Sequence, residues 1–108
     1  MGKMKEIADY LPLSEATYYI MFALVNPMHG YGVMKFVEEV SGGAVKVGPS
    51  TFYSAVSTLK NEKIIEMVRE EGRRKEYQLT DKGKAVLNAQ LDRLEQMVGL
   101  GKKALKED

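Results

Sequence analysis

Four stretches of the chain space their apolar residues at the three- and four-residue intervals of an α-helix. The first begins at Ser14, a residue type that caps helices well, and runs through Val25 until Pro27 forces the chain out of the helical conformation. The second carries one apolar stripe and is followed by two glycines: Val33, Phe36, Val37 and Val40, then Gly42 and Gly43. The third begins at Pro49, which suits a first helical turn, and its predicted inward face is Phe52, Ala55, Val56 and Leu59.

The fourth stretch predicts a long helix that starts after Thr80, a second capping residue. Its apolar residues fall at heptad-like intervals: Leu87, Leu91, Leu94, Val98 and Leu105. This spacing is typical of a helix that pairs with another helix. Gly99 and Gly101 weaken helix propensity, so we expect the last turns to fray before the charged tail.

Three other segments are predicted to be extended strands. Residues 44–47 alternate apolar and polar positions, as a very short strand does. Residues 64–69 and 75–79 are two further runs, and the polar connection between them contains Gly72, which predicts a hairpin. The order of elements predicts a mainly α (α+β) fold: a winged helix-turn-helix with a two-stranded wing and a long C-terminal dimerisation helix.

The 108 residues correspond to a single compact domain. We divide them into a flexible N-terminal segment (residues 1–12), the winged helix-turn-helix (13–80), and a C-terminal dimerisation helix with a charged tail (81–108). A chain this small buries a modest share of its surface by itself, which favours pairing with a second copy.

The amino-acid composition limits the classes of function that are possible. The absence of cysteine excludes disulfides, thiolate nucleophiles and cysteine-ligated zinc, and it suits a reducing cytoplasm. The longest apolar run, residues 18–25, is far shorter than the roughly 20 residues that a membrane-spanning helix needs. The net charge is only +1, so any binding of nucleic acid must depend on a local basic patch.

Such a patch is predicted around the third helix and the hairpin. The outer face of the helix is rich in short hydroxyl side chains, which can donate to phosphates or base edges, and the hairpin tip is basic. Arginine can clamp a phosphate or enter a narrow minor groove. The candidate DNA-binding residues are Pro49, Ser50, Thr51, Tyr53, Ser54, Ser57, Lys60, Arg69, Arg73, Arg74, Lys75 and Lys82.

Three separate motifs resemble those of the PadR family of transcriptional regulators, in the family's order: residues 28–32 (MHGYG), 48–56 (GPSTFYSAV) and 73–83 (RRKEYQLTDKG). The resemblance implies a homodimeric winged-helix repressor of the short subfamily, with one helix after the wing. It also implies that residues 49–53 form the recognition segment and residues 73–75 the basic wing. The final helix contains no tryptophan, so the resemblance does not extend to a site that sandwiches flat drugs.

The predicted dimer interface combines the last helix with the first: Leu87, Leu91, Leu94 and Val98 with Tyr18 and Phe22. Two-fold symmetry would place the recognition helices in successive major grooves of double-stranded DNA, so the operator should be an imperfect palindrome. Tyr18, Tyr19 and Met97 are expected near the dimer centre and form a candidate pocket for a small-molecule effector, since the resemblance implies varied effectors.

The function predicted from these observations is sequence-specific DNA binding that represses transcription by covering a promoter. The alternative is a winged-helix module that binds another protein through the same helix, and the near-neutral net charge favours it. An enzyme is not expected, because the single histidine, His29, has no nucleophile or orienting partner at a recognisable spacing. No metal or cofactor site is predicted.

Overall fold

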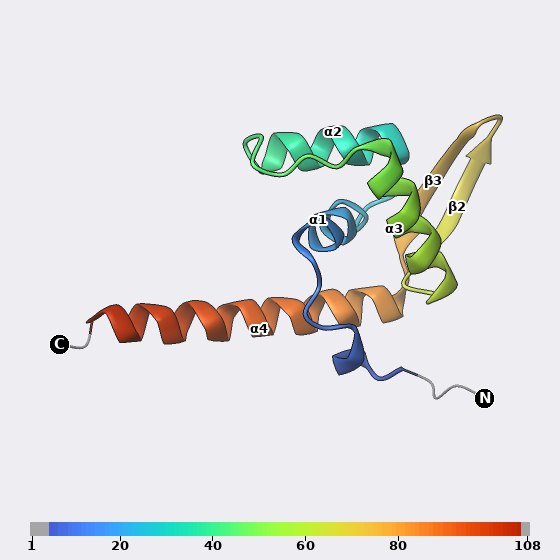
Figure 1. Ribbon diagram of the computed structural model, residues 1–108. Coiled ribbons are helices and arrows are strands. Elements are labelled where there is room, and N and C mark those ends of the chain that lie inside the picture. Colours follow the sequence, from blue (N-terminus) through green and yellow to red (C-terminus); the bar gives the residue numbers. More distant parts are fainter. Residues whose placement is uncertain (1–4, 107–108) are drawn as a thin grey trace.

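The computed structural model describes residues 5–106. In chain order its elements are η1 (Ile7–Tyr10), α1 (Glu15–Ala23), β1 (Met28–His29), α2 (Gly30–Val40), α3 (Pro49–Asn61), β2 (Ile65–Glu71), β3 (Arg74–Leu79) and α4 (Asp81–Lys106). Helices α1 to α3 pack together, the β2–β3 hairpin projects from one side, and α4 extends far beyond them on the other (Figure 1). The predicted winged helix-turn-helix of the α+β class is confirmed.

The buried core lies between α1, α2, α3 and the sheet. Ser14 caps α1 as predicted, and its hydroxyl oxygen accepts a hydrogen bond of 3.1 Å from the Thr17 N–H. The fully buried side chains of the core come from α1 and its C-cap, α2, α3, the segment after α3, and α4: Ile20, Met21, Leu24, Val33, Val37, Phe52, Ile64 and Val86. Helix α1 is therefore the central element, with α2 and α4 packed against it.

The sheet has three antiparallel strands in the order β1–β3–β2, whereas the sequence predicted two paired strands. The additional strand β1 pairs with β3 through Met28 opposite Tyr77. The short strand predicted at residues 44–47 is wrong, because these residues adopt no regular secondary structure. Their alternation has another cause: Val45 and Val47 are buried in the core while the residues between and before them are exposed.

We call the β2–β3 hairpin the wing. Its strands extend further than predicted, so only Gly72 and Arg73 connect them. Gly72 has a φ of +60°, a conformation that glycine adopts without strain. The register shifts between Met67 and Arg69, which marks an irregularity in β2.

His29 ends β1 and caps α2. Its Nδ1 accepts a hydrogen bond of 3.2 Å from the Gly32 N–H, which satisfies one of the free donors in the first turn of the helix. Gly30 sits so close to the Phe52 ring that an added Cβ would lie 2.8 Å from it. The start of α2 and the start of α3 are thus in direct contact.

Helix α4 is continuous through Gly99 and Gly101 to Lys106, so the predicted fraying of its last turns is wrong. Each glycine lowers helix stability by about 1 kcal/mol, but the surrounding leucine, lysine and alanine are strong helix formers. Lys103 and Lys106 in the last turn also complement the negative end of the helix dipole.

The segment predicted to be flexible, residues 1–12, contains a helix. Residues 1–4 lie outside the described part, whereas Ile7–Tyr10 form the 3₁₀ helix η1, which packs against α4. Whether the segment is flexible stays a prediction, but the structure folds residues 5–12 against the rest of the chain. The physical reason is a pair of long-range hydrogen bonds: Tyr10 OH donates to Glu62 Oε1 at 2.8 Å, and the Leu13 N–H donates to Gln90 Oε1 at 3.1 Å.

The end of α3 is joined to the start of α4 at what we call the α3–α4 junction, formed by Glu62, Lys63, Ile64, Thr80, Lys82 and Gly83. Thr80 Oγ1 donates to the Lys63 carbonyl at 2.7 Å and accepts from the Gly83 N–H at 3.0 Å. Its own N–H donates to the Ile64 carbonyl at 3.0 Å. An added Cβ on Gly83 would overlap that same carbonyl oxygen, so glycine is required for the close approach.

Replacing Gly83 with alanine should therefore force the junction apart. We expect Gly83→Ala to lower the free energy of unfolding by about 2–3 kcal/mol, the upper part of the range for overpacked sites, because the added Cβ would meet a backbone atom. Gly99→Ala is the matched control, because its Cβ would meet nothing within 4 Å, and it should raise stability by about 0.5–1 kcal/mol. Urea denaturation of both variants checks this, and similar effects at the two positions would contradict it.

His29→Ala should lower the free energy of unfolding by about 1 kcal/mol, because the cap of α2 is lost. In a chain of this size that corresponds to a fall in Tm of about 4–8 °C. His29→Asn should keep most of the stability, since an asparagine oxygen also caps well. Thermal denaturation distinguishes the two variants, and equal losses would show that the cap is not what His29 contributes.

Candidate nucleic-acid interface

The exposed face of α3 carries the hydroxyl side chains identified in the sequence. Its inner face is buried as predicted, with Phe52, Val56 and Leu59 at most 5% exposed. The predicted contact residues of the helix are all exposed: Pro49, Ser50, Thr51, Tyr53, Ser54, Ser57 and Lys60. The helix therefore presents a polar surface of short side chains, above which the Tyr53 ring projects with 59% of its surface exposed.

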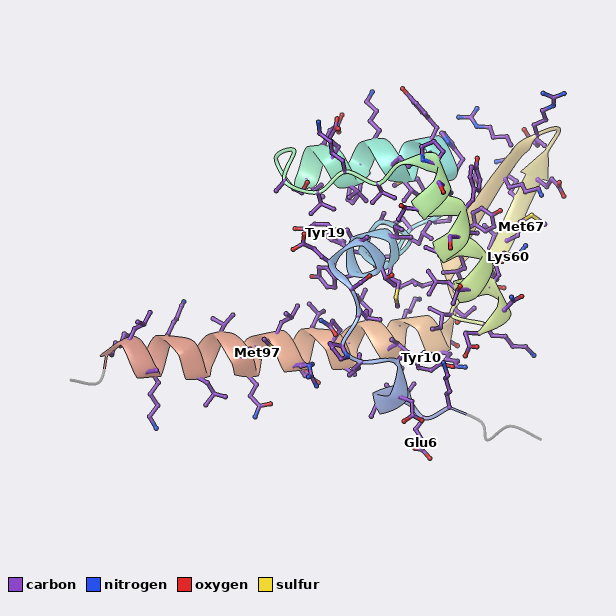
Figure 2. All side chains as sticks on the ribbon, in the orientation of Figure 1. Glu6, Tyr10, Tyr19, Lys60, Met67 and Met97 are labelled. Atoms are coloured by element: carbon purple, nitrogen blue, oxygen red, sulfur yellow. The ribbon has the colours of Figure 1, made fainter. Side chains whose placement is uncertain are left out.

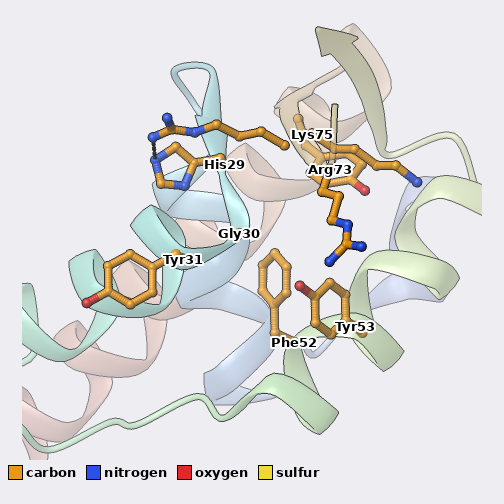
Figure 3. Close-up of a pocket in the computed structure, with 9 residues that line it drawn as sticks. His29, Gly30, Tyr31, Phe52, Tyr53, Arg73 and Lys75 are labelled. Atoms are coloured by element: carbon orange, nitrogen blue, oxygen red, sulfur yellow. Dashed lines mark hydrogen bonds between the residues drawn. The ribbon is translucent and has the colours of Figure 1, made fainter. Parts of the chain in front are cut away.

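A cavity of about 440 Å³ separates α3 from the wing, and we call it the wing cavity. Figure 3 shows the Arg73 side chain reaching from the wing toward Tyr53. The lining residues come from the start of α2, the start of α3 and the wing: His29, Gly30, Tyr31, Phe52, Tyr53, Arg73, Arg74, Lys75 and Tyr77. Three of these are cations and none is acidic, so the wing cavity is a basic hollow.

The positive end of α2 adds to this charge, because the helix begins at Gly30 in the wall of the wing cavity. Backbone N–H groups at a helix start and nearby arginines are the groups that bind phosphate in proteins. The arrangement can therefore hold one phosphate group of an extended polyanion.

His29 makes two contacts that compete. Its Nδ1 accepts from the Gly32 N–H, and its Nε2 lies 2.6 Å from Arg74 Nη2 (Figure 3). A neutral imidazole has one acceptor nitrogen, and an arginine has donors only. Both contacts cannot be hydrogen bonds of the same neutral ring. When the His29 Nδ1 caps α2, its Nε2 carries the proton and cannot accept a hydrogen bond from Arg74.

Arg69 does not reach the wing cavity. Its guanidinium binds Glu71 Oε1 with Nη2 at 2.6 Å and Nε at 3.0 Å. Both side chains are more than 60% exposed, so this ion pair adds little stability, but it neutralises the charge of Arg69 locally. Of the four wing cations predicted to contact DNA, the structure brings together Arg73, Arg74 and Lys75.

The two remaining lysines differ in position. Lys60 is exposed on α3, with Nζ 5.9 Å from the centre of the Tyr77 ring at the base of the wing. Lys82 instead donates to the Glu62 carbonyl at 2.8 Å and lies 5.0 Å over the Tyr10 ring. The Lys82 ammonium is thus engaged at the α3–α4 junction and does not line the wing cavity, and its predicted phosphate contact stays a prediction.

A second hollow of about 440 Å³ lies on the other side of α3, against the start of α1. Hydroxyl groups dominate its lining, which consists of Ser14, Ala16, Thr17, Ser50, Thr51, Ser54, Ala55, Thr58 and Leu59. The hydroxyl face predicted for α3 is therefore divided. Tyr53 faces the basic wing cavity, whereas Ser50, Thr51 and Ser54 face a neutral groove.

The predicted dimer residues fall into two groups. Leu87 is 8% exposed and belongs to the core of its own chain, so it leaves no free surface for a partner. Further along α4, Leu91 is 38% exposed and Val98 53%, while Leu94 is half-buried. On α1, Tyr18 is half-buried and Phe22 is exposed.

In the single chain, one residue of the predicted effector pocket, Met97, lies apart from the other two, Tyr18 and Tyr19. Tyr18 and Tyr19 meet edge to face with ring centres 5.5 Å apart, and both contact the Phe22 ring. Met97 lies on the part of α4 that extends beyond α1 (Figure 2). None of these three predicted pocket residues lines the wing cavity or the groove beside α1.

Sequence reasoning missed the contribution of His29, Gly30 and Tyr31 to the wing cavity. The only signal for them in the sequence is the motif at residues 28–32, which does not show that they lie beside the wing. Their position depends on the pairing of β1 with β3, which joins residues about 50 positions apart.

Within residues 5–106, no group of three or more histidine, aspartate or glutamate side chains is placed to hold a metal ion. The helices described are too short or too polar to span a bilayer.

Comparison with known proteins places this geometry in a family. The model of the PadR-like family of transcriptional regulators matches residues 5–89. A transcriptional regulator from Clostridium thermocellum has a similar structure, with 20% identity and a TM-score of 0.70 over 93% of this chain and 97% of its own. Bacillus subtilis PadR, solved in complex with operator DNA, is 26% identical with a TM-score of 0.64, over 72% of this chain and 47% of that one.

An uncharacterized 37.1 kDa protein in transposon TN4556 of Streptomyces fradiae is 28% identical over 87 residues, which are 80% of this chain. The match spans a quarter of that protein's length. The family match covers most of the chain, and the fold agrees with it throughout. The chain belongs to the PadR-like family of transcriptional regulators.

Proposed function

We propose that this protein is a homodimeric, sequence-specific DNA-binding repressor that reads double-stranded DNA with α3 and the wing. The observation that carries the proposal is the wing cavity, which sets three cations and a helix start beside the exposed face of α3. The Bacillus subtilis relative, solved in complex with operator DNA, supports DNA as the partner.

In this proposal α3 lies in the major groove with its first turns nearest the base edges. Tyr53 and Ser57, one turn apart, face the bases or the adjacent phosphates on the wing side. Serine and threonine hydroxyls pair with several bases, so direct readout by α3 is modest. The DNA backbone next to the groove passes over the wing cavity, where Arg73 and Lys75 hold a phosphate together with the start of α2.

The second copy is proposed to cover the distal half of α4. This half carries exposed apolar residues along one stripe, including Leu91 and Val98, and extends beyond the rest of the molecule (Figure 1). An apolar stripe of this length on an isolated helix is typical of an interface. Two-fold pairing would set the recognition helices about 34 Å apart, which fits an imperfect palindromic operator.

Repression is proposed to occur in the cytoplasm by occlusion of a promoter, with release by a small molecule. The effector would bind where the aromatic side chains Tyr18 and Tyr19 of one chain approach Met97 in the dimer. The exposed position of Met97, 58%, and the edge-to-face rings support this place for a flat or apolar compound.

The wing should supply affinity that depends on salt. Arg73→Ala combined with Arg74→Ala should weaken binding to every duplex and flatten the salt dependence: the negative slope of log K against log salt should become smaller in magnitude by about 0.9 for each phosphate contact that is lost. Tyr53→Ala should weaken binding in a more sequence-dependent manner. Fluorescence anisotropy at several salt concentrations measures both effects.

Arg69→Ala is the matched control for the wing, because Arg69 is an exposed wing arginine that is already bound to Glu71. It should leave the salt slope nearly unchanged. An equal effect of Arg69→Ala, or an unchanged slope in the double variant, would remove the wing cavity from the DNA contact. A wild-type chain that binds no duplex at low salt would overturn the proposed function itself.

Val98→Asp should dissociate the dimer. Val98 is 53% exposed in the single chain, so the substitution leaves the fold of each copy intact, but it buries a carboxylate in the pair. An unpaired buried charge costs about 3 kcal/mol or more, which raises the dimer Kd at least about a hundredfold. Gln96→Asp, exposed off the apolar stripe, is the control and should leave a dimer in sedimentation velocity. Equal behaviour of the two variants would place the interface elsewhere.

A further inference from the structure

We infer that Tyr10 is a positioning residue for DNA recognition: it braces the α3–α4 junction and thereby sets the distance between the two recognition helices of the dimer. The inference rests on the proposed function, because that distance matters only in a dimer that binds DNA. The observation behind it is a set of contacts that tie η1 to both helices at once.

The hydroxyl and the ring of Tyr10 bind different parts of the junction. The hydroxyl donates to Glu62 Oε1 at 2.8 Å, and Glu62 is the residue that ends α3. The ring lies under two ammonium groups, Lys5 Nζ at 5.2 Å and Lys82 Nζ at 5.0 Å from its centre. Lys82 belongs to the first turn of α4, so a single side chain contacts the end of one helix and the start of the other.

Lys82 completes the link. While its Nζ lies over the Tyr10 ring, it also donates to the Glu62 carbonyl at 2.8 Å. Tyr10, Glu62 and Lys82 therefore form a closed ring of contacts. The Tyr10 side chain lies beside the start of α4, on the side where η1 crosses it (Figure 2).

The segment that carries Tyr10, residues 7–13, is held in place by its own contacts with α4. Helix η1 packs on α4, and α4 passes between η1 on one side and α1 on the other (Figure 1). The Leu13 N–H donates at 3.1 Å to the Oε1 of Gln90, whose side chain is buried in this sandwich. Tyr10 therefore contacts the junction from a segment that is itself fixed to α4, and this allows it to hold the junction in place.

The length of α4 makes the angle at this junction important. The helix has 26 residues, which corresponds to about 39 Å. A rotation of about 10° at the junction would move a point 20 Å away by roughly 3–4 Å, which is about one base-pair step along DNA. A brace that limits such rotation therefore limits the half-site spacings that the dimer accepts.

The first test measures the angle directly and needs no DNA. The chain contains no cysteine, so spin labels can be placed at Ser57→Cys in α3 and Gln96→Cys in α4. Labelled chain diluted with unlabelled chain reports the distance within one copy. We compare Tyr10→Phe, which lacks only the hydroxyl, and Tyr10→Ala, which also lacks the ring, with Glu62→Gln, whose amide oxygen still accepts from Tyr10.

The expected result is a distance distribution that widens from wild type to Tyr10→Phe and again to Tyr10→Ala, with Glu62→Gln close to wild type. A width that is the same in all four proteins overturns the inference. Widening that occurs equally in Glu62→Gln also overturns it, since the hydroxyl contact would then not be the cause.

The second test uses palindromic duplexes whose half-sites are separated by the preferred spacing or by one base pair more or fewer. A hydrogen bond such as that of Tyr10 is worth about 2–10-fold in an equilibrium constant, so the preference for one spacing should fall by about that factor in Tyr10→Phe. An equal loss of affinity at every spacing, together with a lower Tm, would show a merely structural role and overturn the inference.

The two proposals fail in different ways. If wild-type chain binds none of the duplexes, the proposed function fails, and the spin-label distances still decide whether Tyr10 holds the junction. If wild type binds with a clear spacing preference that Tyr10→Phe retains in full, the brace fails and the proposed function stands.

Discussion

The close approach between the first turn of α4 and the end of α3 is the constraint on which the remaining structure depends. The Ile64 carbonyl accepts from the Thr80 N–H and leaves no room for a side chain at position 83. This contact makes α3, the proposed DNA-reading helix, and α4, the proposed dimerisation helix, a single unit. The separation of the binding surfaces in an assembly then follows from the geometry of one chain.

The charge distribution explains how a nearly neutral chain can attract a polyanion. The net charge is +1, yet the wing cavity collects three cations and the positive end of α2 without an acidic side chain in its lining. Two acidic residues outside this lining have partners of their own: Glu71 binds Arg69, and Glu62 binds Tyr10. Because exposed charges are screened within about 10 Å at moderate salt, this local arrangement matters more than the total.

Features set by neighbouring residues were predictable from the sequence, and features set by distant contacts were not. The Ser14 cap, the start of α3 at Pro49 and the hairpin at Gly72 each depend on a few adjacent positions. By contrast, β1 exists because Met28 meets Tyr77, and η1 is held by contacts that reach Glu62 and Gln90. The contact between Lys82 and the Glu62 carbonyl could not be predicted for the same reason, because the two residues lie 20 positions apart.

Hydroxyl-radical footprinting on a duplex obtained by in vitro selection tests the central claim most directly, because it shows which face of the DNA two copies of α3 and the wing cover. The account predicts two protected patches, related by two-fold symmetry and centred about 10 base pairs apart on one face of the helix. One asymmetric patch, or uniform protection around the duplex, would contradict it.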